Sequence, residues 1–251
     1  MSSCCEHSVT GRSRASAASH SSPVTQRVGK NGRVIEAVVF DLDGVLIDSE
    51  PVWEQVRRSY VAECGGRWPV DAQDRLMGMS TPEWARYLSE EAGVGRQPAA
   101  VAAAVVERMA HRYAEDLPLI PGALEALCRL GDRWPLGLAS SSPRSLIDSV
   151  LAAAGLTHRF AVTVSTEEVP RGKPAPDVYL AAVQSLGLPP ERCVAVEDST
   201  NGLLAAAAAE LVVVALPRPE YRPSAEALGL ALIVATHLDE LTTSTIEGLD
   251  Q

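Results

Sequence analysis

The sequence predicts an α/β fold: a Rossmann-like parallel-sheet core with helices on both faces, plus an inserted small all-α cap domain. Short apolar runs, each bounded by turn or polar residues, alternate with helical stretches along the chain. Strands that alternate with helices indicate a parallel sheet covered on both faces. The first crossover is unusually long, because more than ninety residues separate Asp41 from Pro135, whereas a plain crossover needs only about a dozen.

Length and composition narrow the classes of protein. The 251 residues, 46% of them apolar, allow one large domain or a domain with a smaller companion. A net charge of −10 disfavours a nucleic-acid partner, and the absence of an apolar run of 18 residues disfavours a membrane span. Five cysteines without a CxxC motif favour a reducing compartment. We therefore expect a cytoplasmic protein, and a monomer.

The core is expected to contain six strands. The first is VIEAVVF, ending at Phe40, and the others cover 135–140, 161–165, 193–197, 212–216 and 231–235. Helices are expected at Arg144–Ala154, Pro176–Leu186 and Asn201–Ala209, between these runs.

The long first crossover reads as helical throughout residues 51–118, which we assign to the cap domain. Residues 33–50 and 119–241 would form the core, with hinges at 47–51 and 117–122; the alternative is one domain with a long helical excursion. Ser49 is expected to cap the first cap helix, with Asp48 and Glu50 at its start.

Residues 1–32 are rich in Ser, Arg and Gly and are expected to be a disordered tail or a misassigned start, or else a transit peptide. Residues 242–251 are expected to be a C-terminal tail.

Acidic residues follow two strands of the predicted sheet. Asp41 and Asp43 come directly after the first strand, and Glu197-Asp198 ends the fourth. In open parallel sheets ligands bind at the carboxyl ends of the strands, so these side chains are expected to converge. Mg²⁺ is bound by one or two carboxylates together with phosphate oxygens. Asp41 and Asp198 are therefore candidate Mg²⁺ ligands, although acids at such positions can also cap helices.

Groups suited to a phosphate follow the other two strands. Ser140 and Ser141 lead into a helix whose N-terminus could bind an anion, although Ser141 or Ser142 could instead cap that helix. Lys173, one of two lysines in the chain, follows the third strand in the turn RGKPAPD. A lysine is a compact charge suited to a phosphoryl group. The substrate is thus expected to be a small phosphorylated metabolite.

This set of residues predicts that the phosphoryl group is transferred first to a side chain of the enzyme and then to water. Asp41, held at the strand end, is expected to attack phosphorus as the nucleophile. Asp43, two residues on and pointing the same way, is expected to act as the general acid and base. Mg²⁺ and Lys173 would neutralise the phosphoryl oxygens.

The order of these motifs resembles the haloacid dehalogenase superfamily, in its phosphatase branch. VVFDLDGVLIDSEP, LASSS, GKPAPD and VAVEDSTNG resemble the four motifs of that family, through Asp41 and Asp43, Ser140, Lys173, and Glu197 and Asp198. The resemblance implies that Glu197 and Asp198 hold Mg²⁺, that the Asp43 carbonyl contacts the metal, and that the helical insert closes over the substrate. LIDSEPVW and LASSSP are most similar to small sugar-phosphate phosphatases.

Other functions remain open at this stage. A phosphomutase similar to the beta-phosphoglucomutases is one alternative, although Gly78-Met79-Ser80 is followed by Thr81 and the cap has no lysine. A module that binds phosphometabolites without catalysis is another. Trp53, Met79 and Trp84 could line the site or simply pack in the cap.

Overall fold

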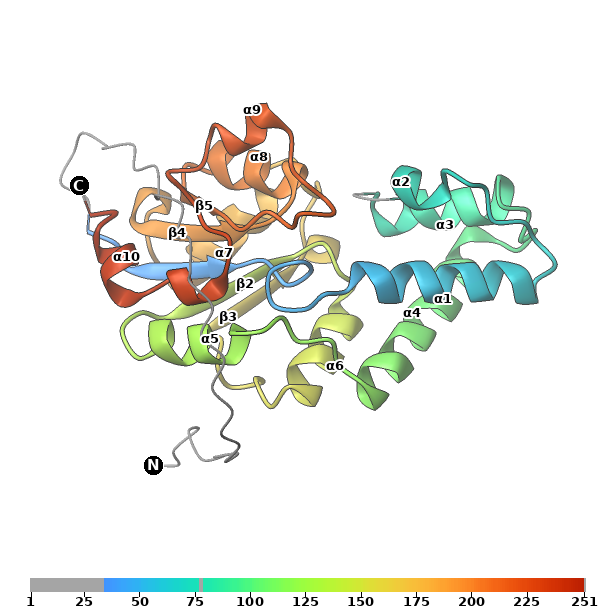
Figure 1. Ribbon diagram of the computed structural model, residues 1–251, viewed down its shortest axis with the longest axis horizontal. Coiled ribbons are helices and arrows are strands. Elements are labelled where there is room, and N and C mark those ends of the chain that lie inside the picture. Colours follow the sequence, from blue (N-terminus) through green and yellow to red (C-terminus); the bar gives the residue numbers. More distant parts are fainter. Residues whose placement is uncertain (1–33, 77–78, 251) are drawn as a thin grey trace, which may run out of the picture.

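The computed structural model describes residues 34–76 and 79–250, and within them a six-stranded parallel sheet forms the centre of the molecule (Figure 1). The strand order is β3-β2-β1-β4-β5-β6, and every neighbouring pair is parallel. The strands are β1 (Ala37–Phe40), β2 (Leu136–Ser140), β3 (Val162–Ser165), β4 (Cys193–Glu197), β5 (Val212–Ala215) and β6 (Ile233–Val234). This order confirms the expected Rossmann-like core, whose direction of winding reverses next to β1.

Alternate residues of the central strands enter two separate hydrophobic cores, because successive side chains of a strand point to opposite faces. Val38 and Phe40 of β1 belong to one core and Ala37 and Val39 to the other. All four side chains of this strand are completely buried. Each fully buried valine or phenylalanine contributes about 1.5–3 kcal/mol, so covering both faces explains why the strands read as uninterrupted apolar runs.

Helices cover both faces of the sheet (Figure 1). The first core contains residues of α5 (Ala123–Gly131), α6 (Arg144–Ala153) and α10 (Thr243–Glu247); the second contains residues of α7 (Asp177–Leu186), α8 (Thr200–Ala208) and α9 (Ala225–Leu228). Short 3-10 turns complete the layer: η1 (Thr166–Glu168), η2 (Pro190–Arg192) and η3 (Leu238–Glu240).

Four helices between β1 and α5 stand apart from the sheet, beyond the carboxyl end of β1 (Figure 1). They are α1 (Glu50–Glu63), α2 (Ala72–Leu76), α3 (Thr81–Glu90) and α4 (Pro98–Glu115), and we call residues 50–115 the helical insert. The two segments that connect the insert to the core are hydrogen-bonded to each other, because the Asp48 N–H donates to the Pro118 carbonyl at 2.8 Å. The insert also packs against the core through α4 and α6.

Several expectations about the ends of elements need correction. Residues 243–247 form α10, and Ile246 and Leu249 are buried, so the expected C-terminal tail is wrong: apolar side chains there complete the first core. Ser49 precedes α1 but has helical backbone angles and no capping hydrogen bond from its side chain. Five of the six strands are shorter than the apolar runs that predicted them, and β4 matches its run. The expected N-terminal tail lies outside the described residues, and so does Gly78 of the Gly78-Met79-Ser80 segment.

Membrane crossing was disfavoured by the sequence. Within residues 34–76 and 79–250, no helix combines the length and the apolar character that a crossing requires.

Candidate active site

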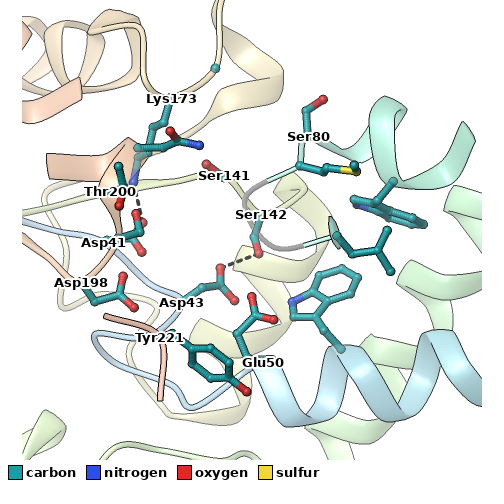
Figure 2. Close-up of a pocket in the computed structure, with 18 of the residues that line it drawn as sticks. Asp41, Asp43, Glu50, Ser80, Ser141, Ser142, Lys173, Asp198, Thr200 and Tyr221 are labelled. Carbon is teal, nitrogen blue, oxygen red and sulfur yellow. Dashed lines mark hydrogen bonds and ion pairs between the residues drawn. The ribbon is translucent and has the colours of Figure 1, made fainter. Parts of the chain in front are cut away.

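A cavity of about 610 Å³ lies between the carboxyl edge of the sheet and the helical insert (Figure 2). Its core side is formed by the segments that follow β1, β2, β4 and β5, together with Gly172 and Lys173. Its other side is formed by α1, α2 and α3. The site residues expected from the sequence therefore gather at one edge, as the parallel topology requires.

Lys173 joins two of the acidic groups at the base of the cavity. Its Nζ lies 2.7 Å from Asp41 Oδ1 and 2.6 Å from Glu197 Oε1, and it also donates to the Ala139 carbonyl at 3.0 Å. The ammonium is almost fully enclosed. Burial alone would lower the pKa of Lys173, but the two carboxylates outweigh burial and raise it. Lys173 is therefore a fixed positive charge beside Asp41 (Figure 2).

Asp41 lies just beyond β1 and is 6% exposed. Burial raises the pKa of its carboxyl group to about 8, against the opposing effect of Lys173; the charges of Glu197 and Asp43 add to the rise. A second cation at this position would reverse that rise, because a nearby positive charge favours the ionised carboxylate.

Glu197 is the most completely enclosed of the acids, with no exposed surface. The Tyr179 hydroxyl donates to its Oε1 at 2.8 Å, on the oxygen that also receives Lys173. The other oxygen accepts from the backbone N–H of Asp198 at 3.1 Å and from the Ser199 hydroxyl at 3.2 Å. Glu197 thus holds Lys173 in place and fixes the start of α8.

Two glycines make room for this packing. A Cβ on Gly202 would lie 1.9 Å from the carboxyl carbon of Glu197, and a Cβ on Gly44 would lie 1.8 Å from Asp198 Oδ2. Gly44 also has a φ of +78°, which other residues rarely adopt. Any larger side chain at these positions would displace an acid.

Asp43 occupies a different part of the cavity from Asp41 (Figure 2). Its Oδ2 accepts hydrogen bonds from the Ser142 hydroxyl at 2.7 Å and, more weakly, from the Ser140 hydroxyl at 3.4 Å. Its Oδ1 has no hydrogen-bond partner among the residues described. The side chain of Leu42, between the two aspartates, is buried in the core, so both aspartates enter the cavity as expected.

The serine turn after β2 differs from its expected role. Ser140 is completely buried, and its hydroxyl accepts from the Ser142 N–H at 3.0 Å. Ser141 and Ser142 line the cavity, whereas Ser140 does not. The N-terminus of α6 is also already engaged, because the Arg144 N–H donates to Glu167 Oε2 at 2.9 Å. Phosphate contacts in this conformation would therefore come from the turn rather than from the helix end.

Three of the four residues expected to hold a metal form one cluster. Asp41, Glu197 and Asp198 each place a carboxylate oxygen within 4.8 Å of the others. The pKa of Asp198 is raised well above its ordinary value by burial, and then by the charges of Glu197 and Asp41. Hard divalent cations are bound by carboxylate oxygens, and three buried or half-buried carboxylates lie close together here. The residues present therefore fit Mg²⁺. The Asp43 side chain points toward Ser142 instead of joining the cluster, which leaves its carbonyl as the expected ligand.

The two acids expected at the start of the first cap helix also line the cavity. Asp48 forms an ion pair of 2.9 Å with Arg218, across the mouth of the cavity. Glu50 lines the cavity and accepts from Gln73 Nε2 at 2.9 Å. Burial raises the pKa of Glu50, opposed by the charge of Arg57. Glu50 is thus part of the cavity wall as well as the start of α1.

Sequence reasoning missed several residues that form the cavity. The loop after β5 contributes Arg218, Glu220, Tyr221, Arg222 and Pro223, and the rule that ligands lie at strand ends could have found it. Arg57, on α1, lacked any signal beyond its helical position. Trp53, Met79 and Trp84 were expected to pack in the cap, with lining of the site as the alternative; they line the cavity, and both tryptophans are also buried in the insert.

The sheet order and an acidic site beside a buried lysine define a Rossmann-like enzyme that works at the carboxyl edge of its sheet. The chain belongs to the haloacid dehalogenase-like hydrolases, because that family's model matches residues 35–210.

Known proteins of this family resemble most of the chain. Hexitol phosphatase B of Escherichia coli K12 is 34% identical over 223 residues, 86% of this chain and 98% of the relative. Fructose-1-phosphate phosphatase YqaB of the same organism is 30% identical over 68% of this chain and 91% of its own length. The crystal structure of CbbY from Rhodobacter sphaeroides with phosphate has a TM-score of 0.76 at 30% identity, covering 87% of this chain and all of that chain. The protein is thus a hydrolase of this family, as the resemblance implied, and both of these Escherichia coli relatives are phosphatases.

Proposed function

We propose that the protein is a Mg²⁺-dependent phosphatase that hydrolyses small sugar phosphates through a phosphoaspartate on Asp41. The carrying observation is the position of Asp41 at the base of the cavity, 2.7 Å from Lys173, with Asp43 held separately by Ser142. The phosphatases similar to this chain support a sugar phosphate as the substrate class.

Asp41 suits the nucleophile because its carboxylate is held rigidly. One oxygen is bound by Lys173, whose charge favours the ionised carboxylate and opposes the effect of burial, and the second oxygen is left to attack phosphorus in line. The positive charge of Lys173 would also offset the charge on the phosphoryl oxygens as they pass through the transition state.

Asp43 suits proton transfer because one of its oxygens is held and the other is unpartnered. Ser142 fixes Oδ2, Oδ1 is buried without a hydrogen bond from the described residues, and Asp43 as a residue lines the cavity. A protonated Asp43 would donate its proton to the leaving oxygen, and the resulting carboxylate would then take a proton from the attacking water.

Mg²⁺, when bound, would supply charge neutralisation to the phosphoryl group. Asp41, Asp198 and the Asp43 carbonyl are its proposed ligands, with Glu197 beside them. Because both Glu197 oxygens already accept hydrogen bonds, we propose that its main task is to position Lys173 and the start of α8.

A panel assay tests this function. Purified protein with Mg²⁺ would be incubated with hexitol phosphates, hexose phosphates and triose phosphates, with and without glucose 1,6-bisphosphate, and inorganic phosphate measured. Phosphate release without the bisphosphate supports a phosphatase. Isomerisation of a sugar phosphate that requires the bisphosphate and releases no phosphate would establish the mutase alternative instead.

A further inference from the structure

Arg57 is a buried cation in the wall of the cavity. It lies on α1, is 5% exposed, and lines the cavity opposite the catalytic edge. Its guanidinium carbon lies 4.5 Å from the centre of the Trp53 ring and 5.1 Å from that of Trp84. The two rings are 5.8 Å apart and tilted by 58°. Two aromatic side chains therefore hold the guanidinium in one position.

Within the described part of the chain, the buried Nε–H of Arg57 has no hydrogen-bond acceptor. The charges that act on Arg57 among the residues described do so without a hydrogen bond. Contacts with aromatic faces satisfy the charge in part, but they leave the donors at the edge of the group unused. A buried donor without an acceptor is costly, so this group is suited to an acceptor that arrives with a ligand.

Glu50 provides the opposite chemistry on the same wall. It accepts a hydrogen bond from Gln73 through one oxygen, and the amide oxygen of Gln73 is buried without a partner. Figure 2 shows the Glu50 carboxylate reaching into the cavity between Asp43 and Tyr221. The wall therefore offers acceptors at Glu50 and donors at Arg57, without an ion pair between the two.

The charges around Arg57 decide between two kinds of ligand. The acids that act on it most strongly are Glu50 and then Asp43. A second anionic group would gain from Arg57 but would be repelled by both carboxylates. A hydroxyl group is not repelled, and it can donate to a carboxylate while it accepts from a guanidinium. The balance of charge thus favours a neutral, hydroxylated ligand.

We propose that Arg57 and Glu50 form a subsite that binds hydroxyl groups on the uncharged end of the substrate, with Arg57 as the specificity-determining residue. This inference rests on the proposed phosphatase function. It narrows the substrate class to phosphate monoesters of neutral polyols and sugars, and it places bisphosphates and phosphorylated sugar acids among the poor substrates.

Matched substrates and variants test the subsite. The substrates are sorbitol 6-phosphate, 6-phosphogluconate, which carries a carboxylate at the far end of the same carbon chain, and p-nitrophenyl phosphate, which has no hydroxyl groups. The variants are Arg57→Met, which keeps an unbranched side chain between the tryptophans, Arg57→Lys, and Arg86→Leu as an exposed arginine of the same insert. Binding of sorbitol 6-phosphate to an Asp41→Asn background would be followed by calorimetry.

Wild-type enzyme should prefer sorbitol 6-phosphate to 6-phosphogluconate. Arg57→Met should lower kcat/KM for sorbitol 6-phosphate about 10- to 100-fold, the range expected for a lost hydrogen bond to a charged group, and weaken its binding. It should leave p-nitrophenyl phosphate and the melting temperature nearly unchanged, and Arg86→Leu should match wild type.

Other outcomes separate the possible failures. An equal loss on all three substrates would show that Arg57 has a structural role only. A larger loss on 6-phosphogluconate would show that it binds a second anion, and unchanged activity would remove it from recognition; each would overturn the subsite. Absence of turnover by wild type on every phosphate ester would instead reject the proposed function.

Discussion

Lys173 Nζ lies 2.7 Å from Asp41 Oδ1, although 132 positions separate the two residues in the chain. The contact joins the turn after β3 to the end of β1, which are not adjacent strands of the sheet. The same ammonium binds Glu197, the last residue of β4. One side chain therefore links three of the loops that form the active site.

Replacing Lys173 by Met should lower kcat/KM about 10²- to 10³-fold, the usual effect of removing one group that stabilises transition-state charge. It should also lower the free energy of unfolding by about 3–5 kcal/mol, because Asp41 and Glu197 would lose their buried counter-charge. Kinetics and urea unfolding would measure the two effects. Arg171→Met is the control, since Arg171 is an exposed neighbour that pairs only with Asp177 among the described acids.

Asp41→Asn should reduce phosphate release by at least about 10⁴-fold, as expected when a nucleophile is lost. The fold should be retained, because asparagine has nearly the same shape and removes a buried charge. Circular dichroism would check the fold, and a phosphate assay the turnover. Wild-type turnover in this variant would mean that another group attacks phosphorus.

Asp43→Asn should separate the two halves of the reaction. Phosphorylation of Asp41 should still occur slowly with a good leaving group, while hydrolysis of the phosphoenzyme should stall, and overall turnover should fall about 10²- to 10⁴-fold. Mass spectrometry of acid-quenched protein would detect the covalent phosphate. Turnover equal to that of wild type would remove Asp43 from proton transfer.

Gly202→Ala should damage the site without touching a catalytic group. The new Cβ would meet the Glu197 carboxyl group at 1.9 Å, so α8 or Glu197 must move, and Lys173 would lose its anchor. We expect weaker Mg²⁺ activation together with a lower melting temperature. Gly155→Ala is a useful comparison: its Cβ would meet open space and only its positive φ is strained, which should cost about 1 kcal/mol and leave activity intact.

Glu210→Gly should stabilise the protein by about 0.5–1 kcal/mol. Glu210 follows α8 with a φ of +64°, a left-handed conformation that disfavours any residue with a Cβ, and glycine offsets part of the gain through its freer unfolded chain. Denaturant unfolding would measure the difference, with activity unchanged. Glu210→Ala keeps the Cβ and should bring no gain; equal stabilisation by both variants would attribute the effect to the lost charge.

Local patterns were sufficient for much of the fold and for the charged residues of the site. Buried strands such as β1 consist of apolar residues because both faces are covered, and the acids and Lys173 follow strand ends where parallel topology brings them together. Element ends were less predictable, since Leu249 and Ile246 show no periodicity long enough to indicate α10. The orientation of Ser140 could not be predicted, because a strand-end serine looks the same in the sequence whether its hydroxyl faces a cavity or its own turn.

The sequence by itself determined the parallel sheet, the long helical insert, and the gathering of Asp41, Asp43, Lys173, Glu197 and Asp198 at one edge, because these follow from the period and order of residues along the chain. The tertiary structure alone decided that the Tyr179 hydroxyl donates to Glu197 and that the Ser142 hydroxyl donates to Asp43. It also decided that Arg57 lies against Trp53 and Trp84. Such contacts depend on packing angles between elements and on side-chain conformations. Those are set by the whole core at once, and no local pattern encodes them.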